Sequence, residues 1–128
     1  MNKVQALQAF WESFGWPAID EQSAYDAGTL EQLGISYPYI TTETATSDFD
    51  SVIPLGADLW DRSPSWERVT KKALEIEQEI GLGGKLIPYD GGAIWITKRS
   101  PFSPRQSADA GFDVRRIHIN INAEFLSA

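Results

Sequence analysis

The feature that most constrains the fold of this chain is a strict alternation of side-chain character over residues 115–125. One set of alternate positions is mainly apolar and consists of Arg115, Ile117, Ile119, Ile121, Ala123 and Phe125. The set between them is polar and consists of Arg116, His118, Asn120, Asn122 and Glu124. Successive side chains of a β-strand point to opposite faces of a sheet, so this period of two predicts a strand with one core face and one polar face. The rest of the chain must supply partner strands and a cover for the core face.

Two hairpins are predicted as the source of those partner strands. Residues 37–45 are rich in aromatic and β-branched side chains and predict one strand. A turn at 47–50 leads into 52–62, whose alternating apolar positions suit an antiparallel, half-buried second strand. The second hairpin is predicted to join 85–89 to 93–98 around a glycine-rich reversal.

Two amphipathic helices are predicted to cover the sheet. The first is capped by Asn2, with Gln5 completing a capping box, and ends before Gly15. Its apolar face consists of Val4, Leu7, Phe10, Trp11 and Phe14. The second is predicted over 64–80, because Ser63 is a favoured N-cap residue and a proline follows it. Its apolar positions recur at helical spacing and are Trp66, Val69, Ala73, Ile76 and Ile80.

Two segments lack a sustained period. Residues 18–36 are predicted to form an ordered loop with at most one short helical turn, and residues 99–113 a long loop that is mobile in the isolated subunit. Together the elements predict an α+β fold, in which a mostly antiparallel or mixed β-sheet is packed by two main helices.

Length and composition predict one soluble domain that spans residues 1–128. A length of 128 residues suits a single core, and a hydrophobic content of 42% provides the material to fill it. The absence of cysteine excludes disulfides, thiolate catalysis and sulfur-ligated zinc. No run of about 18 apolar residues is present to span a membrane, so we expect a cytoplasmic protein.

The charge is negative overall and unevenly distributed. A net charge of −7 argues against general affinity for nucleic acid. Residues 1–84 hold 5 Lys/Arg and 14 Asp/Glu, whereas residues 85–128 hold 6 and 4. Such polarity suits head-to-tail assembly of copies, and equally suits solvated faces of unequal charge.

No catalytic or metal-binding constellation is predicted. His118 is the only histidine, and nothing in the spacing brings a serine and an aspartate to it, so an exposed or interface position is favoured over catalysis. The glycines of 81–85 follow a helix instead of opening one, unlike those of a phosphate-binding loop. The segment beginning Asp48-Phe49-Asp50 lacks the glycine and the final glutamate of a calcium loop. We therefore expect no enzymatic activity, no cofactor and no metal ion.

The second predicted helix is electrically polar. Arg68, Lys71 and Lys72 lie toward its start. Glu75 and Glu79 lie near its end, where the helix dipole disfavours negative charge. One hypothesis is that a neighbouring subunit pairs its basic part with this acidic part. The alternative is ordinary solvated charge.

Several short motifs occur in a fixed order along nearly the whole chain. They are Pro17-Ala18, Tyr25-Asp26, Tyr37-Pro38-Tyr39-Ile40-Thr41, Leu59-Trp60 with Arg62 and Ser63, Gly83-Gly84-Lys85, Tyr89-Asp90-Gly91-Gly92-Ala93-Ile94-Trp95, and Arg115-Arg116 through Glu124-Phe125-Leu126. As an ordered set they resemble the small tail terminator, or tail completion, proteins of long-tailed bacteriophages, which are minor tail proteins.

This resemblance implies a tail-terminator-like fold and a structural role in the virion. The expected assembly is a homo-oligomeric ring, hexameric in form, that caps the tail tube, ends its polymerisation and presents a surface for head-tail joining. The expected partners are further copies of the chain, the tail tube protein, and a head-tail connector or stopper protein. DNA is expected only in passage through the ring, no membrane is expected, and the host cytoplasm is the place of assembly.

The contacts are predicted to use a basic group on or beside the long loop, facing an acidic tube or connector surface. Its members are Lys98, Arg99, Arg105, Arg115 and Arg116. An alternative within the structural class is another neck protein, such as a connector or stopper. An alternative of another class is a small hydrolase or carbohydrate-binding domain that uses Trp60, Trp66 or Trp95 with nearby acids, and its mark would be an aromatic-lined pocket with convergent carboxylates.

Overall fold

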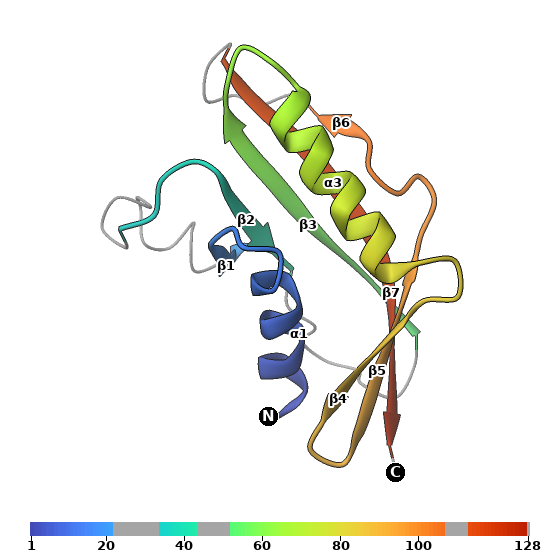
Figure 1. The fold of residues 1–128 in the computed structure, drawn as a ribbon. Helices are drawn as coiled ribbons and strands as arrows, with labels where there is room; N and C mark the ends of the chain where they lie inside the picture. The colour runs from blue at the N-terminus through green and yellow to red at the C-terminus, as the bar shows by residue number, and fades with distance from the viewer. Residues whose placement is uncertain (22–33, 44–51, 107–112, 128) are drawn as a thin grey trace.

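The computed structural model describes residues 1–21, 34–43, 52–106 and 113–127 (Figure 1). Its helices and strands are α1 (Lys3–Glu12), β1 (Ala18–Asp20), β2 (Tyr39–Thr42), β3 (Val52–Arg62), α3 (Glu67–Ile80), β4 (Lys85–Tyr89), β5 (Gly92–Lys98), β6 (Arg105–Gln106) and β7 (Val114–Ser127). The predicted α+β class, with a mixed sheet packed by two helices, is confirmed. Among the described residues, no helix has the length and hydropathy needed to cross a bilayer.

The sheet is built around one long antiparallel pair. The strand order is β1-β2-β3-β7-β5-β4, with β6 also paired to β7. β3 and β7 pair along the whole of β3, from Val52 opposite Glu124 to Arg62 opposite Val114. The pairing of β1 with β2 is parallel, and the other strand pairs are antiparallel. Both predicted hairpins are present, although the turn predicted at 47–50 lies outside the described residues.

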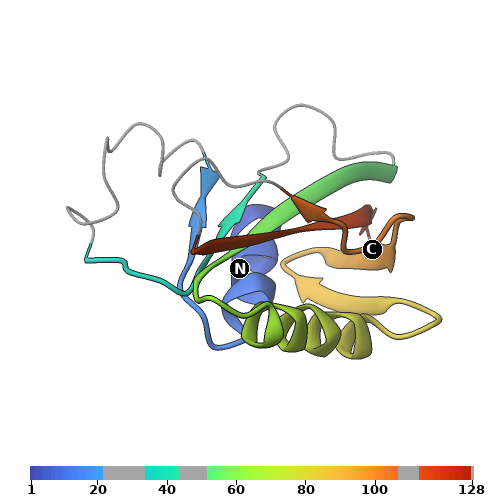
Figure 2. The same ribbon diagram turned by 90° about the horizontal axis from the view of Figure 1, so that it is seen from above.

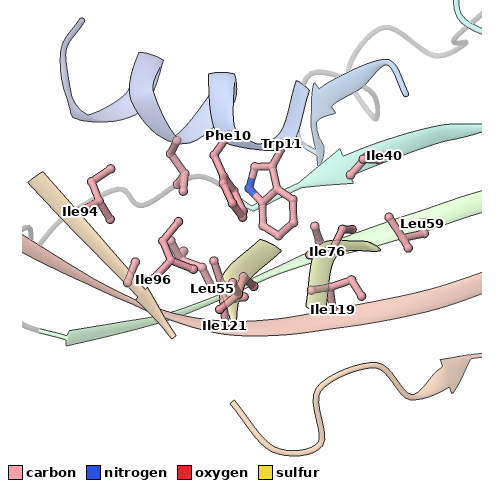
Figure 3. Close-up of a cluster of buried hydrophobic side chains, with 14 of the residues drawn as sticks. Phe10, Trp11, Ile40, Leu55, Leu59, Ile76, Ile94, Ile96, Ile119 and Ile121 are labelled. Atoms are coloured by element: carbon pink, nitrogen blue, oxygen red, sulfur yellow. The ribbon is translucent and has the colours of Figure 1, made fainter. Parts of the chain in front are cut away.

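Both helices pack on the same face of the sheet (Figures 1 and 2). Phe10 and Trp11 point from α1 toward the strands, and Ile76 of α3 lies among the strand side chains (Figure 3). The strand residues of this core include Ile40, Leu55, Leu59, Ile94, Ile96, Ile117, Ile119, Ile121 and Ala123. The apolar set predicted over residues 115–125 therefore faces the helices, with Arg115 at the edge of the core face.

α1 forms as its sequence predicts. The Asn2 side chain accepts a hydrogen bond from the Gln5 backbone N–H at 2.8 Å, and the Gln5 side chain accepts one from the Asn2 N–H at 2.9 Å. This reciprocal box satisfies two of the amide donors that open the helix. Val4 is 45% exposed and lies outside the core, unlike the other predicted apolar positions of this helix.

The start of α3 was predicted three residues too early. The Ser63 hydroxyl accepts a hydrogen bond from the Ser65 N–H, and the helix begins at Glu67. Residues 63 and 64 are held by β7 instead, because the Arg115 guanidinium donates to the carbonyl oxygens of Ser63 and Pro64 at 3.0 Å each. These contacts fix the segment in a turn before the helix.

Two short strands were not predicted. Ala18–Asp20 forms β1 at the edge of the sheet within a segment predicted as loop. Arg105–Gln106 forms β6 within the predicted long loop. Residues 99–104 have no regular secondary structure, as predicted, but residues 99–106 are joined to β7 by backbone hydrogen bonds, including one from the His118 N–H to the Pro104 carbonyl. Residues 107–112 lie outside the described residues.

Candidate association surface on the open face of the sheet

The polar side chains of β7 lie on the face of the sheet opposite the helices. In an antiparallel pair, residues directly opposite each other share a face, so the register extends this face to the neighbouring strands. His118 is opposite Asp58, Arg116 is opposite Trp60, and Trp60 is opposite Tyr39. No helix in the described part of the chain covers this side, which we call the open face (Figure 2).

A charged cluster occupies the centre of the open face. The two Asp58 carboxylate oxygens accept hydrogen bonds from Nε and Nη2 of Arg116, both at 3.1 Å. Nδ1 of His118 lies 2.8 Å from Oδ1 of Asp58. The exposed side-chain fractions are 9% for Asp58, 30% for Arg116 and 22% for His118, so water only partly screens the cluster. Bidentate pairing of this kind fixes side-chain orientation as well as charge.

Aromatic rings continue this cluster toward β2. The Arg116 guanidinium lies 5.0 Å from the Trp60 ring centroid, and Trp60 stacks on Tyr39 at a centroid distance of 6.1 Å. The Trp60 indole N–H donates to the Thr41 hydroxyl at 2.9 Å. Burial, and then the neighbouring Tyr37, raise the pKa of Tyr39 well above its ordinary value. These contacts hold the aromatic rings in fixed positions.

Gly56 makes room for the histidine ring. A Cβ at this position would lie 2.7 Å from Cε1 of His118 and 3.1 Å from Oε1 of Glu43. The Gly56 N–H donates to the Glu43 carboxylate at 3.0 Å. His118 and Glu43 therefore both lie over the bare backbone of β3.

The hydrogen-bond partners of His118 in the described part of the chain are a carboxylate and backbone groups. A carboxylate bonded to Nδ1 orients an imidazole as in a catalytic triad, yet no hydroxyl within the described ranges is hydrogen bonded to His118. Asp58 also carries Arg116, which makes the group an ion-pair cluster. The same ranges contain no group of three or more His, Cys, Asp or Glu side chains placed to hold a metal ion.

An apolar patch lies at the other end of the open face. Leu86, Trp95, Glu124 and Val52 form one continuous row across β4, β5, β7 and β3. Pro88, Ala93 and Leu126 form the next row on the same face. Glu124 is the one charged side chain among these seven. We call the side chains of these two rows the apolar patch.

The basic residues predicted as one contact group do not form one surface. Arg116 lies on the open face, bound to Asp58. Arg105 and Arg115 lie on the helix side, where their guanidinium groups are 4.6 Å and 5.4 Å from the Trp66 ring centroid. Arg99 donates to the Asn120 side-chain oxygen at 3.0 Å. Lys98 is half-buried and opposite Ile121, a core position.

The charges predicted as a helix interface mostly have partners within the subunit. Lys72 donates to the Phe14 carbonyl at 2.7 Å and to Glu75 at 2.9 Å, and Lys85 pairs with Glu79. Arg68 binds Asp61, a carboxylate of β3 with no exposed side-chain area. Hydrogen bonding to Asp61 raises the pKa of Arg68. End-to-end pairing of these helices would thus have to break ion pairs already formed, and Lys71 alone in this group makes no such contact within the described ranges.

The three tryptophans of the hydrolase or carbohydrate alternative lie apart. Trp60 is on the open face beside Arg116, and Trp66 is on the helix side between two arginines. Trp95 is in the apolar patch, where its indole N–H donates to the Gly83 carbonyl at 3.0 Å. They do not line a common pocket.

The stability of a Glu21 variant at two pH values tests how strongly the negative charges near the cluster repel one another. Burial, and then the charges of Glu43, Asp58 and Asp20, raise the pKa of Glu21. When the pKa of a carboxyl group is higher in the folded than in the unfolded state, the folded protein loses stability as the pH rises from the unfolded-state pKa through the folded-state pKa. We expect Glu21→Gln to be more stable than the parent at neutral pH and equally stable below about pH 4. Urea unfolding at the two pH values measures this, with Glu12→Gln as the control for loss of one exposed negative charge.

Comparison with known proteins leaves the family open: no family model, no curated protein and no solved structure matches the chain.

Proposed function

We propose that this chain is a structural subunit that joins further copies of itself in a ring and caps the tail tube of a long-tailed bacteriophage. In that role the ring ends tube polymerisation and offers a surface to the head-side connector or stopper protein. A hexamer is the form that the resemblance implies. DNA would pass through the ring without specific contacts, and the protein would reside in the virion neck.

The observation that carries this proposal is the open face itself. The hydrogen-bonded cluster of Asp58, Arg116 and His118 lies on the same face as an apolar patch whose large side chains are exposed to water. Exposed apolar patches on a folded domain are characteristic of association surfaces. The resemblance of the ordered sequence motifs to the tail terminator family supports the use of such a surface in tail assembly.

The test is reconstitution with purified tail tubes. Tube protein polymerised alone is expected to give tubes of irregular length, whereas added chain should stop growth and appear as a ring at one tube end in negative-stain electron microscopy. Binding along the sides of the tubes, or no enrichment at their ends, would reject this role. Rings found on isolated connector complexes and not on tubes would assign the chain to another neck position.

A further inference from the structure

The apolar patch contains four of the eight large apolar side chains that are exposed in the described part of the chain. The exposed fractions are 61% for Leu86, 52% for Val52, 40% for Trp95 and 39% for Leu126. Neighbouring strands lie about 4.8 Å apart, so the row from Leu86 to Val52 spans roughly 14 Å. Removing such a surface from water is favourable, and a partner would do so.

Glu124 defines what kind of partner fits. It lies in the row between Trp95 and Val52 and has no hydrogen-bond or ion-pair partner within the described ranges. A carboxylate that loses water in an interface requires a cation from the other side. The surface that covers the patch must therefore carry an apolar side chain with a free basic group close to it.

The outer face of α3 carries that combination. Glu67, Lys71, Leu74 and Gln78 follow one another at helical spacing, and each is exposed. Leu74 is 53% exposed, and Lys71 lies one helical turn before it. Lys71 makes no ion pair within the described ranges, whereas Arg68 and Lys72 do. An unpaired ammonium beside an exposed leucine complements an unpaired carboxylate among exposed apolar groups.

These two surfaces lie on opposite sides of the subunit. α3 packs on one face of the sheet (Figure 2), and the strand register places the apolar patch on the other. A contact between them cannot be made within one subunit, and it uses two different surfaces. Such a heterologous contact propagates from copy to copy and closes into a ring when the rotation permits.

We infer that a second copy of this chain covers the apolar patch with the outer face of its α3, so that Leu74 packs near Trp95 and Lys71 pairs with Glu124. The inference rests on the proposed function for the closed ring and adds the surfaces that join the copies. It replaces the end-to-end pairing of helix charges with a helix-on-sheet contact.

Charge exchange tests the pairing. Lys71→Glu and Glu124→Lys should each weaken self-association at least about tenfold in sedimentation velocity, because each places like charges in every contact. An equimolar mixture of the two variants should recover assemblies larger than a dimer, since each contact between unlike subunits then joins opposite charges. Glu12→Lys makes the same charge change as Glu124→Lys on α1 and should leave association unchanged. No recovery on mixing, or recovery of dimers alone, would overturn the inference.

Cross-linking gives a second test that does not depend on affinity. The chain has no cysteine, so Leu74→Cys combined with Leu86→Cys introduces the only two thiols. Mild oxidation should give a ladder of dimers, trimers and larger species on a non-reducing gel, whereas either single variant should stop at dimers. Leu74→Cys with Val4→Cys, an exposed position outside the patch, is the control and should give no ladder.

A double variant that cross-links no further than this control overturns the inference. Rings that still cap tail tubes in that case would reject only the assigned surfaces. A chain that never gathers at tube ends would instead reject the proposed function.

Discussion

Replacing Trp11 with alanine is expected to destabilise the fold by roughly 3–5 kcal/mol, the cost of removing a large aromatic side chain from a core. Trp11 is 1% exposed and lies in the centre of the layer between α1 and the sheet (Figure 3). Its ring packs against Phe10 at a centroid distance of 5.0 Å, so the substitution also removes one of the two aromatic rings that contact Phe10. Because domains of this size are stable by only about 5–15 kcal/mol, the substitution should remove a large fraction of the free energy of unfolding.

The measurement is urea unfolding followed by far-ultraviolet circular dichroism, since tryptophan fluorescence would change with the substitution itself. Val4→Ala on the same helix is the control. Val4 is 45% exposed, and its substitution should cost no more than about 0.5 kcal/mol. Equal losses for the two variants would show that α1 is not packed on the sheet as described.

Replacing Asp58 with alanine is expected to cost about 3 kcal/mol, the lower end for breaking a buried ion pair by removing one partner. The loss is large because Arg116 and His118 both lose their carboxylate. It stays at the lower end because 30% of the Arg116 side chain is exposed and can be hydrated. Thermal unfolding of the variant measures the loss.

A double-mutant cycle separates the pairing from the general effect of the substitution. Adding Arg116→Ala to Asp58→Ala should cost much less than Arg116→Ala costs alone, because its partner is already absent. The cycle should return a coupling energy of at least about 1 kcal/mol. Strictly additive losses would mean that the two side chains do not interact in solution.

Much of the fold could be predicted from local patterns. The alternation over residues 115–125 gave the central strand and its core face, and the pair Asn2 and Gln5 gave the start of α1. Each of these patterns involves residues close together in the sequence, so it can be recognised without knowledge of the tertiary structure. The strand Ala18–Asp20 could not be found in this way, because three residues are too few to show a period and the strand is defined by pairing with Tyr39–Thr42.

The start of α3 shows how a distant contact overrides a local preference. Ser63 and the proline after it favour a helix start, but their carbonyl oxygens accept hydrogen bonds from Arg115 of the neighbouring strand β7. No local pattern indicates that contact. The same limit applies to the open face: Asp58 meets Arg116 and His118 only through the register of β3 against β7, which the sequence does not reveal.

This limit also explains why the basic residues of the C-terminal third were predicted as one contact group. Arg99, Arg115 and Arg116 each have a hydrogen-bond partner on another part of the subunit. Counting charges along a sequence cannot distinguish such internal pairs from a free basic surface. The partners, which lie far away in the chain and include backbone carbonyls and an amide as well as a carboxylate, have to be located first.

The long pairing of β3 with β7 also decides when the molecule can fold during its synthesis. Paired residues are about fifty to seventy positions apart along the chain, and β7 supplies the inner neighbour for β3, β5 and β6. The ribosome must therefore release residues 114–127 from its exit tunnel before the sheet can close. Until then the hairpins and helices have no common strand to join them, so the apolar side chains of the core remain exposed on the nascent chain.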